Sequence, residues 1–191
     1  MPRHRFPDTR GRIESAAIRL FVEQGVAETS VRDIARAVDI SEGALYRHFE
    51  SKDELTWSLF EQHYVAFAAR LEALAQAETT ARAQLAAMTR GFCEAHDENP
   101  TLFRFLLFVQ HGQLNKLAPG TPTPVDVVRT VLERAIASKE IPAQSPDMAT
   151  ALVFGIVLQP VTFAAYGRLP GNMRSICDRL ITAAWAAVTS L

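Results

Sequence analysis

The chain has 191 residues, of which 48% are apolar and 21% are charged, and its formal net charge at pH 7 is −1. These values exclude an intrinsically disordered chain, which needs low hydrophobicity and high net charge, and they exclude a uniformly basic nucleic-acid coat. The length is sufficient for one or two domains with a buried core.

Helical periodicity runs through nearly the whole chain, and no segment shows the sustained period-2 alternation of a strand. The first predicted helix spans about 9–24 and ends at Gly25, a residue typical of helix C-caps. Serine N-caps open the next three predicted helices, at Ser30, Ser41 and Ser51. An acidic residue three positions after Ser30 and after Ser51 completes a capping-box pattern at each. The fourth of these helices is predicted to be long.

The C-terminal part of the chain continues the helical pattern. Five further helices are predicted over about 80–97, 101–114, 125–139, 147–167 and 172–190. Proline-containing segments at 118–124, 141–146 and 170–171 separate the last four of them. The sequence therefore predicts an all-α fold with about nine helices.

The second and third predicted helices carry the strongest functional signal. Only Asp39 and Ile40 join them, which is too short for antiparallel stacking and typical of a helix-turn-helix. In that motif the second helix of the pair enters the major groove of DNA, and flanking residues hold phosphates. The predicted third helix begins with small polar residues and then carries Tyr46, Arg47 and His48. Arginines also precede the first helix, at positions 3, 5, 10 and 12, and such an arm can lie along the DNA.

These residues resemble the DNA-binding domain of the TetR/AcrR family. The resemblance lies in residues 29–55, which read TSVRDIARAVDISEGALYRHFESKDEL. They fill the family pattern T-[TS]-x-x-x-I-A, turn, S-x-[GP]-x-[LI]-Y-x-[HY]-F-x-[SN]-K-x-x-L without gaps. One departure is Asp39, where the family commonly has glycine in the turn. Aspartate tolerates the left-handed conformation better than most residues, so we expect the turn to form.

The resemblance implies an N-terminal helix-turn-helix domain over 1–52 and a C-terminal ligand-binding and dimerisation domain over 53–191. It implies a homodimer that binds a palindromic operator, most commonly as a repressor, and leaves the DNA when a small effector binds. The family's DNA contacts fall on Ser30, Arg32, Ser41, Glu42, Gly43, Ala44, Tyr46, Arg47, His48 and Lys52. For Glu42 two interpretations stay open: a hydrogen bond from a cytosine amino group, or a favourable charge at the helix N-terminus.

An effector site is expected among aromatic and histidine side chains of the C-terminal domain. The candidates are His63, Phe67, Phe92, His96, Phe103, Phe108 and His111. Because charged residues are scarce there, we expect a small apolar or aromatic effector. We expect neither a metal nor an organic cofactor. Phenylalanines at helical spacing are more often core than pocket wall, so a plain core remains the alternative.

The last two predicted helices are candidates for the dimer interface, because their small and apolar side chains allow close approach. The predicted interface residues are Leu152, Ile156, Phe163, Ile176, Leu180, Ala184 and Ala187. The alternative is that these helices form only intramolecular core. The uncharged stretch 148–167 nearly reaches membrane-spanning length, but its polar residues favour a helix buried on most faces, so no membrane partner is expected.

Cellular location and redox state can also be predicted. Cys93 and Cys177 form no CxxC motif, so we expect two buried free thiols. The arginine-rich N-terminal segment is not followed by an apolar run, which argues against a signal peptide and predicts a cytoplasmic protein.

Two other classes of function stay open from the sequence. One is a helix-turn-helix activator, or a regulator that answers a protein partner rather than a small molecule. The other, more remote, is a helical-bundle enzyme. Because the sequence has no H-E-x-x-H, E-x-x-H, H-x-H, G-x-S-x-G or phosphate-loop pattern, we predict no catalytic or metal site and no enzyme activity.

Overall fold

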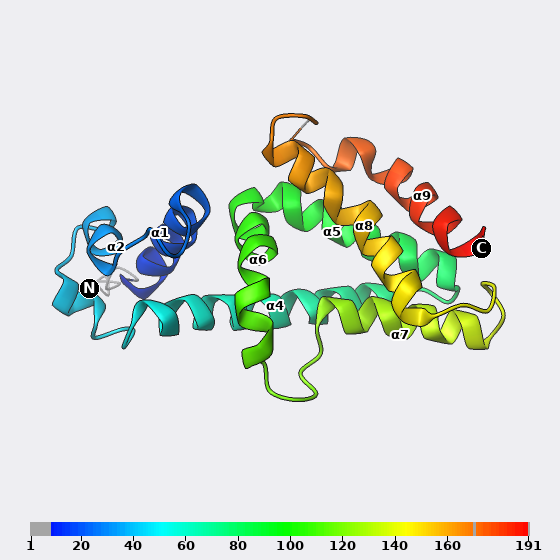
Figure 1. The fold of residues 1–191 in the computed structure, drawn as a ribbon, viewed down its shortest axis with the longest axis horizontal. Coiled ribbons are helices and arrows are strands. Elements are labelled where there is room, and N and C mark those ends of the chain that lie inside the picture. Colours follow the sequence, from blue (N-terminus) through cyan, green and yellow to red (C-terminus); the bar gives the residue numbers. More distant parts are fainter. Residues whose placement is uncertain (1–8, 170, 191) are drawn as a thin grey trace, which may run out of the picture. The chain divides into compact units, whose positions relative to one another are not determined.

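The computed structural model describes residues 9–169 and 171–190 (Figure 1). In that part of the chain it has nine α-helices, two short 3-10 helices and no strand, which confirms the predicted all-α class. The helices are α1 (Thr9–Gln24), α2 (Val31–Ala37), α3 (Glu42–Leu45), α4 (Lys52–Gln76), α5 (Ala81–Glu98), α6 (Pro100–Gln113), η1 (Leu114–Lys116), α7 (Pro124–Ala137), α8 (Pro146–Ala165), η2 (Arg174–Ile176) and α9 (Cys177–Thr189).

The chain divides into two compact units. The first unit comprises residues 1–63 and 101–118, and the second comprises 64–100 and 119–191. Helix α4 therefore contributes its first half to one unit and its second half to the other. Whether 1–52 and 53–191 act as separate functional domains stays a prediction.

Apolar side chains of α1, α2, α3 and the start of α4 form the core of the first unit. The stacked rings of Phe21 and Phe105, with centroids 6.0 Å apart, add α6 to this core. Helix α1 ends where predicted: Gly25 has φ of 96°, and its N–H donates to the Phe21 carbonyl at 3.1 Å. Other core side chains are at most 1% exposed, namely Ile13, Ala17, Ile34, Leu45, Phe49, Leu55 and Leu59.

Serine caps fix the starts of the short helices. The capping box predicted at Ser30 is confirmed, because its hydroxyl accepts from the Asp33 N–H and its own N–H donates to the Asp33 carboxylate. Ser41 caps α3 by accepting from the Ala44 N–H at 3.1 Å. At Ser51 only half of the predicted box forms, since Ser51 accepts from Glu54 N–H while Glu54 Oε2 is buried without a partner among the described residues.

The turn between α2 and α3 depends on Asp39, whose φ of 56° is the left-handed conformation expected for it. Its N–H donates to the Arg36 carbonyl at 3.2 Å, and the Ile40 N–H donates to the Ala35 carbonyl at 3.1 Å. This pair of hydrogen bonds closes α2 in the manner of a Schellman motif. The turn therefore holds α2 and α3 in the helix-turn-helix arrangement despite the absence of glycine.

Replacement of Asp39 tests this turn. We expect Asp39→Ala to lower the free energy of unfolding by about 1 kcal/mol, because alanine adopts a positive φ less readily than aspartate does. Asp39→Gly should leave stability equal or slightly higher, since glycine adopts this conformation without steric cost. Urea unfolding followed by circular dichroism measures both variants, and equal losses for the two would contradict the assigned strain.

The second unit is a bundle in which α8 packs on α7 and α9, and α5 packs on α7 and α9 (Figure 1). Helix α9 begins at Cys177, later than predicted, because η2 precedes it. The Asp97 carboxylate holds this segment by accepting the backbone N–H groups of Met173 at 2.8 Å and Arg174 at 2.9 Å. Cys93 and Cys177 are buried and free, as expected.

One helix of the described chain, α8, is long and apolar enough to cross a membrane by length and composition. Only 28% of its most apolar window is buried inside the chain. The expectation of a helix buried on most faces is therefore wrong for the single chain. The reason is that α7 and α9 cover one side of α8, whereas Met148, Phe163 and Tyr166 remain 58%, 45% and 70% exposed.

Candidate nucleic-acid interface

Helix α3 is short and held tightly at both ends. Ser41 caps its first turn, and Leu45, the last residue of the helix, is fully buried. After α3 the chain turns, with the N–H groups of His48 and Phe49 both donating to the Leu45 carbonyl at 2.9 and 3.2 Å. Because Phe49 is 1% exposed and anchors the end of this turn, the residues between the two anchors project outward.

The predicted base and phosphate contacts on this segment are accessible. Tyr46 is 49% exposed, and Arg47 and His48 are also exposed. At the start of the helix Ser41, Glu42 and Gly43 are exposed and Ala44 is half-buried. A Cβ built on Gly43 would meet no atom within 4 Å, so nothing inside the chain requires glycine there. A small residue at this point leaves room for close approach of another molecule.

The two contacts predicted on and before α2 differ in freedom. Ser30 is exposed, but its hydroxyl is engaged with Asp33 in the cap. The Ser30 hydroxyl and N–H hold the pKa of the Asp33 carboxyl below its usual value, so this cap stays ionised at neutral pH. Arg32 and Arg47 are exposed, and neither guanidinium has a hydrogen bond or ion pair among the described residues. These two cations are thus available to phosphates or bases.

Several other basic side chains are engaged within the first unit, and no sequence pattern predicts these contacts. The Lys52 ammonium donates to three backbone carbonyls. Arg12 donates to the Val38 carbonyl at the end of α2. Arg10 lies 4.7 Å from the centroid of the Phe49 ring and pairs with Glu14 at 2.9 Å. Arginines 3 and 5 of the predicted arm lie outside the described residues.

The predicted effector residues fall in both units. In the second unit Phe67 and Phe92 meet edge to face at 4.9 Å, and Phe92 meets Phe154 likewise at 5.6 Å. Beside Phe92 is a cavity of only about 10 Å³, lined by apolar side chains and Thr89. The Thr89 hydroxyl donates to the Leu85 carbonyl at 2.8 Å, so the cavity walls present no unsatisfied hydroxyl. In the structure this aromatic cluster leaves room for no more than about one water molecule.

The three predicted histidines have different surroundings. His96 is buried, and its Nδ1 lies 2.9 Å from the Asp97 carboxylate that also holds η2, which favours a structural role. His63, in the first unit, is half-buried, and burial lowers the pKa of its imidazole. His111 is exposed on α6. On the same helix Phe103 is buried, whereas Phe108 is 47% exposed beneath the Arg104 guanidinium.

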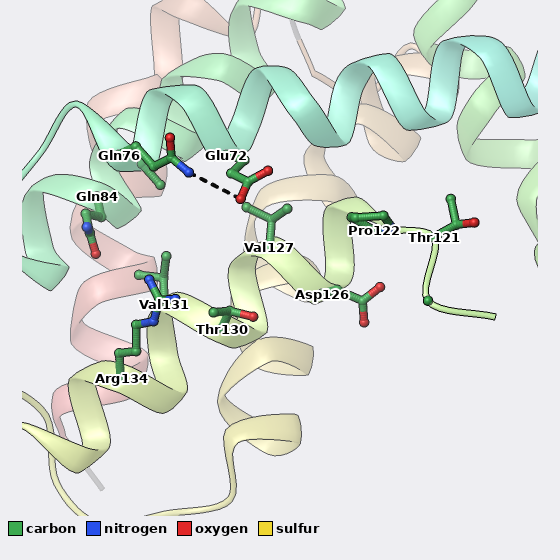
Figure 2. A pocket seen from close by; sticks show the side chains of 12 residues that line it. Glu72, Gln76, Gln84, Thr121, Pro122, Asp126, Val127, Thr130, Val131 and Arg134 are labelled. Carbon is green, nitrogen blue, oxygen red and sulfur yellow. Dashed lines mark hydrogen bonds between the residues drawn. The ribbon is translucent and has the colours of Figure 1, made fainter. Parts of the chain in front are cut away.

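A pocket of about 500 Å³ lies elsewhere in the second unit, between α4, the start of α5, α7 and the loop at 120–122 (Figure 2). Its floor is apolar, with Ala75, Val127 and Val131. Charged side chains border it, namely Glu72, Asp126 and Arg134 (Figure 2). None of the predicted effector residues lines this pocket, whose polar rim differs from the apolar site that the sequence predicted.

The predicted dimer residues separate into two groups. Leu180 and Ala184 are 8% and 0% exposed, so they serve the packing of α9 inside the chain. Phe163 is exposed, and the other four are partly accessible, namely Leu152, Ile156, Ile176 and Ala187. Along α8 the outward residues recur every three or four positions, at 148, 152, 155, 159, 163 and 166, and form one continuous, mostly apolar face.

A family model for bacterial regulatory proteins of the tetR family matches residues 13–56, which contain the helix-turn-helix described above. The HTH-type transcriptional regulator AcrR of Shigella flexneri is 42% identical over 59 residues, which cover 29% of this chain and 27% of AcrR. In such matches the chain spans about a quarter of the length of its curated relatives. They therefore concern only a part of this chain and of each relative.

Two further similarities extend over most of the chain. The fatty acid metabolism regulator protein of Bacillus subtilis is 25% identical over 158 residues, which cover 78% of this chain and 80% of that protein. The crystal structure of the transcriptional regulator FadR from Bacillus subtilis, in complex with stearoyl-CoA, has a TM-score of 0.73 at 18% identity and covers 95% of this chain and 99% of that one. These relatives are regulators rather than enzymes. In the described residues no group of three metal-binding side chains occurs.

Proposed function

We propose that this chain is a TetR/AcrR family transcriptional regulator, a cytoplasmic homodimeric repressor that a small apolar or aromatic effector releases from a palindromic operator. The observation that carries the DNA-binding part is the exposed surface of α3 and the following turn. Tyr46, Arg47 and His48 project from it, and Arg47 has no partner within the described chain. Such a surface fits the major groove, where arginine reads guanine and flanking groups hold phosphates.

Selection of bound sequences from random duplex DNA, with the full chain, tests this proposal. Recovery of an inverted repeat with half-sites about one helical turn apart, or a multiple of it, is the expected result. A gel-shift titration then gives the affinity, and a reporter gene placed behind the selected sequence distinguishes repression from activation. Failure to enrich any sequence would contradict DNA binding.

The outward face of α8 supports the homodimer. This face is continuous and mostly apolar, and its large exposed side chains are Met148, Phe163 and Tyr166. Exposed apolar patches of this kind mark interfaces. Gly155 lies midway along the same face, where a Cβ would meet no atom of the chain. Two copies of α8 and α9 would form a four-helix interface related by a two-fold axis.

The aromatic cluster of the second unit supports an apolar effector. Phe92 and Phe154 line a small cavity whose walls offer no free hydroxyl, and Phe67 packs edge to face on Phe92. A ligand that enters here must displace these rings and replace apolar contacts, so charged molecules are disfavoured by desolvation. The acyl chain of stearoyl-CoA, held by the structurally similar FadR, is also apolar and belongs among the candidates.

Matched ligands test the effector class. We expect toluene to raise the melting temperature and to lower operator affinity about tenfold or more, whereas benzoate and benzylamine, with the same ring and a charge, should do neither. Stearoyl-CoA forms a separate arm. Differential scanning fluorimetry and gel shift give the two readouts. Release by benzoate but not by toluene would refute the apolar effector and leave operator binding itself unaffected.

A further inference from the structure

We propose that Lys52 is a positioning residue, which clamps the turn between α1 and α2 and thereby sets the start of the helix-turn-helix, rather than a phosphate contact. This inference rests on the proposed DNA-binding function, because it assigns Lys52 a role in that activity. The family resemblance predicts a DNA contact at Lys52. The structure adds what its ammonium does.

The geometry uses every donor that Lys52 has. An ammonium group carries three N–H donors. The Lys52 Nζ lies 2.7 Å from the Val26 carbonyl oxygen, 2.9 Å from that of Thr29 and 3.3 Å from that of Ala27. All three carbonyls belong to the turn that follows Gly25, and the lysine itself is half-buried. A contact with a DNA phosphate would require the loss of at least one of these charge-assisted hydrogen bonds.

The clamped turn leads directly into α2, the first helix of the helix-turn-helix. Thr29 is 1% exposed, and its hydroxyl donates to the Gly25 carbonyl at 2.8 Å, which fixes the turn from inside. The next residue is Ser30, the N-cap of α2, and the free cation Arg32 lies in the first turn after it. Lys52 is itself the first residue of α4. The clamp therefore connects the first turn of α4 to the start of α2, and any displacement between these two segments must break it.

A salt titration of operator affinity separates the two roles of Lys52. The full chain is compared with Lys52→Met, which keeps most of the apolar stem. It is also compared with Lys52→Arg, which keeps the charge but replaces the one ammonium nitrogen shared by the three carbonyls with a larger planar guanidinium. Arg47→Ala is the reference for a lost DNA contact. Log affinity falls linearly with log salt concentration, and each phosphate contact makes this slope steeper by about 0.9.

We expect Lys52→Met to lower affinity about tenfold at every salt concentration with an unchanged slope, and Lys52→Arg to fail to restore it. Binding is measured at a temperature at which circular dichroism shows each variant fully folded. Amide hydrogen exchange in Lys52→Met should accelerate at Thr29 and Ser30 and stay unchanged in the core of α1.

Two results would overturn the proposal. A slope reduced by about 0.9 in Lys52→Met, together with normal affinity of Lys52→Arg, would identify a phosphate contact. A lower melting temperature with unchanged affinity of the folded variant would show that Lys52 only adds stability. If the wild-type chain bound no DNA, the proposed function would fail, and the exchange rates at Thr29 and Ser30 would still decide whether the clamp exists.

Discussion

Replacement of Phe163 by aspartate is expected to convert the dimer into monomers and to lower operator affinity by about 100-fold or more. Phe163 is 45% exposed in the single chain and lies on the outward apolar face of α8. In the proposed dimer each substitution would bury a carboxylate without a partner, which is strongly unfavourable. The affinity falls because two linked helix-turn-helix domains bind DNA far more tightly than one, and monomers lose this gain.

Val125→Asp is the matched control for this experiment. Val125 on α7 is 41% exposed, so the substitution places the same charge at a similarly exposed apolar residue outside the outward face of α8. Size-exclusion chromatography with light scattering should give a dimer for wild type and Val125→Asp, and a monomer for Phe163→Asp. A wild-type monomer that binds its operator tightly would contradict the dimer, and an intact Phe163→Asp dimer would place the interface elsewhere.

Most helices of this fold could be predicted from local signals, because residues at their ends mark where they start and stop. Gly25 ends α1 and Ser41 opens α3, and these effects extend over four or five residues only. The predicted start of α9 is too early because the true start depends on a contact distant in sequence. Asp97 on α5 holds the backbone of Met173 and Arg174 and stabilises η2 in place of a longer helix. No pattern within 170–180 reveals that partner.

The roles of charged residues were harder to predict than their positions. Arg47 and Lys52 look alike in sequence as cations beside a short helix, yet one is free and the other donates to three carbonyls. The difference arises from the distance of 26 residues between Lys52 and Val26, which only the folded turn brings together. Likewise, Leu180 and Phe163 are both apolar residues of the last two helices, but only tertiary packing decides which faces outward.

Arg47→Ala is expected to weaken operator binding by about 10- to 100-fold and to relax the preference for one base pair of the half-site. Arg47 is exposed, follows α3 directly and has no hydrogen bond or ion pair in the described part of the chain. Its removal therefore costs no folding energy from a lost internal partner, and the melting temperature should stay within 1 or 2 °C, a shift of roughly 0.5 kcal/mol or less.

Competition with single-base variants of the selected operator distinguishes a base contact from a phosphate contact. A base contact predicts that wild type discriminates at one position by about 1–3 kcal/mol and that Arg47→Ala discriminates there hardly at all. A phosphate contact predicts weaker binding to every sequence and a salt slope lower by about 0.9. Arg90→Ala, an exposed arginine on α5 in the other unit, is the charge-matched control and should change neither quantity. Wild-type affinity and specificity in Arg47→Ala would show that Arg47 does not contact the operator. DNA binding would then depend on Tyr46, His48 and the start of α3.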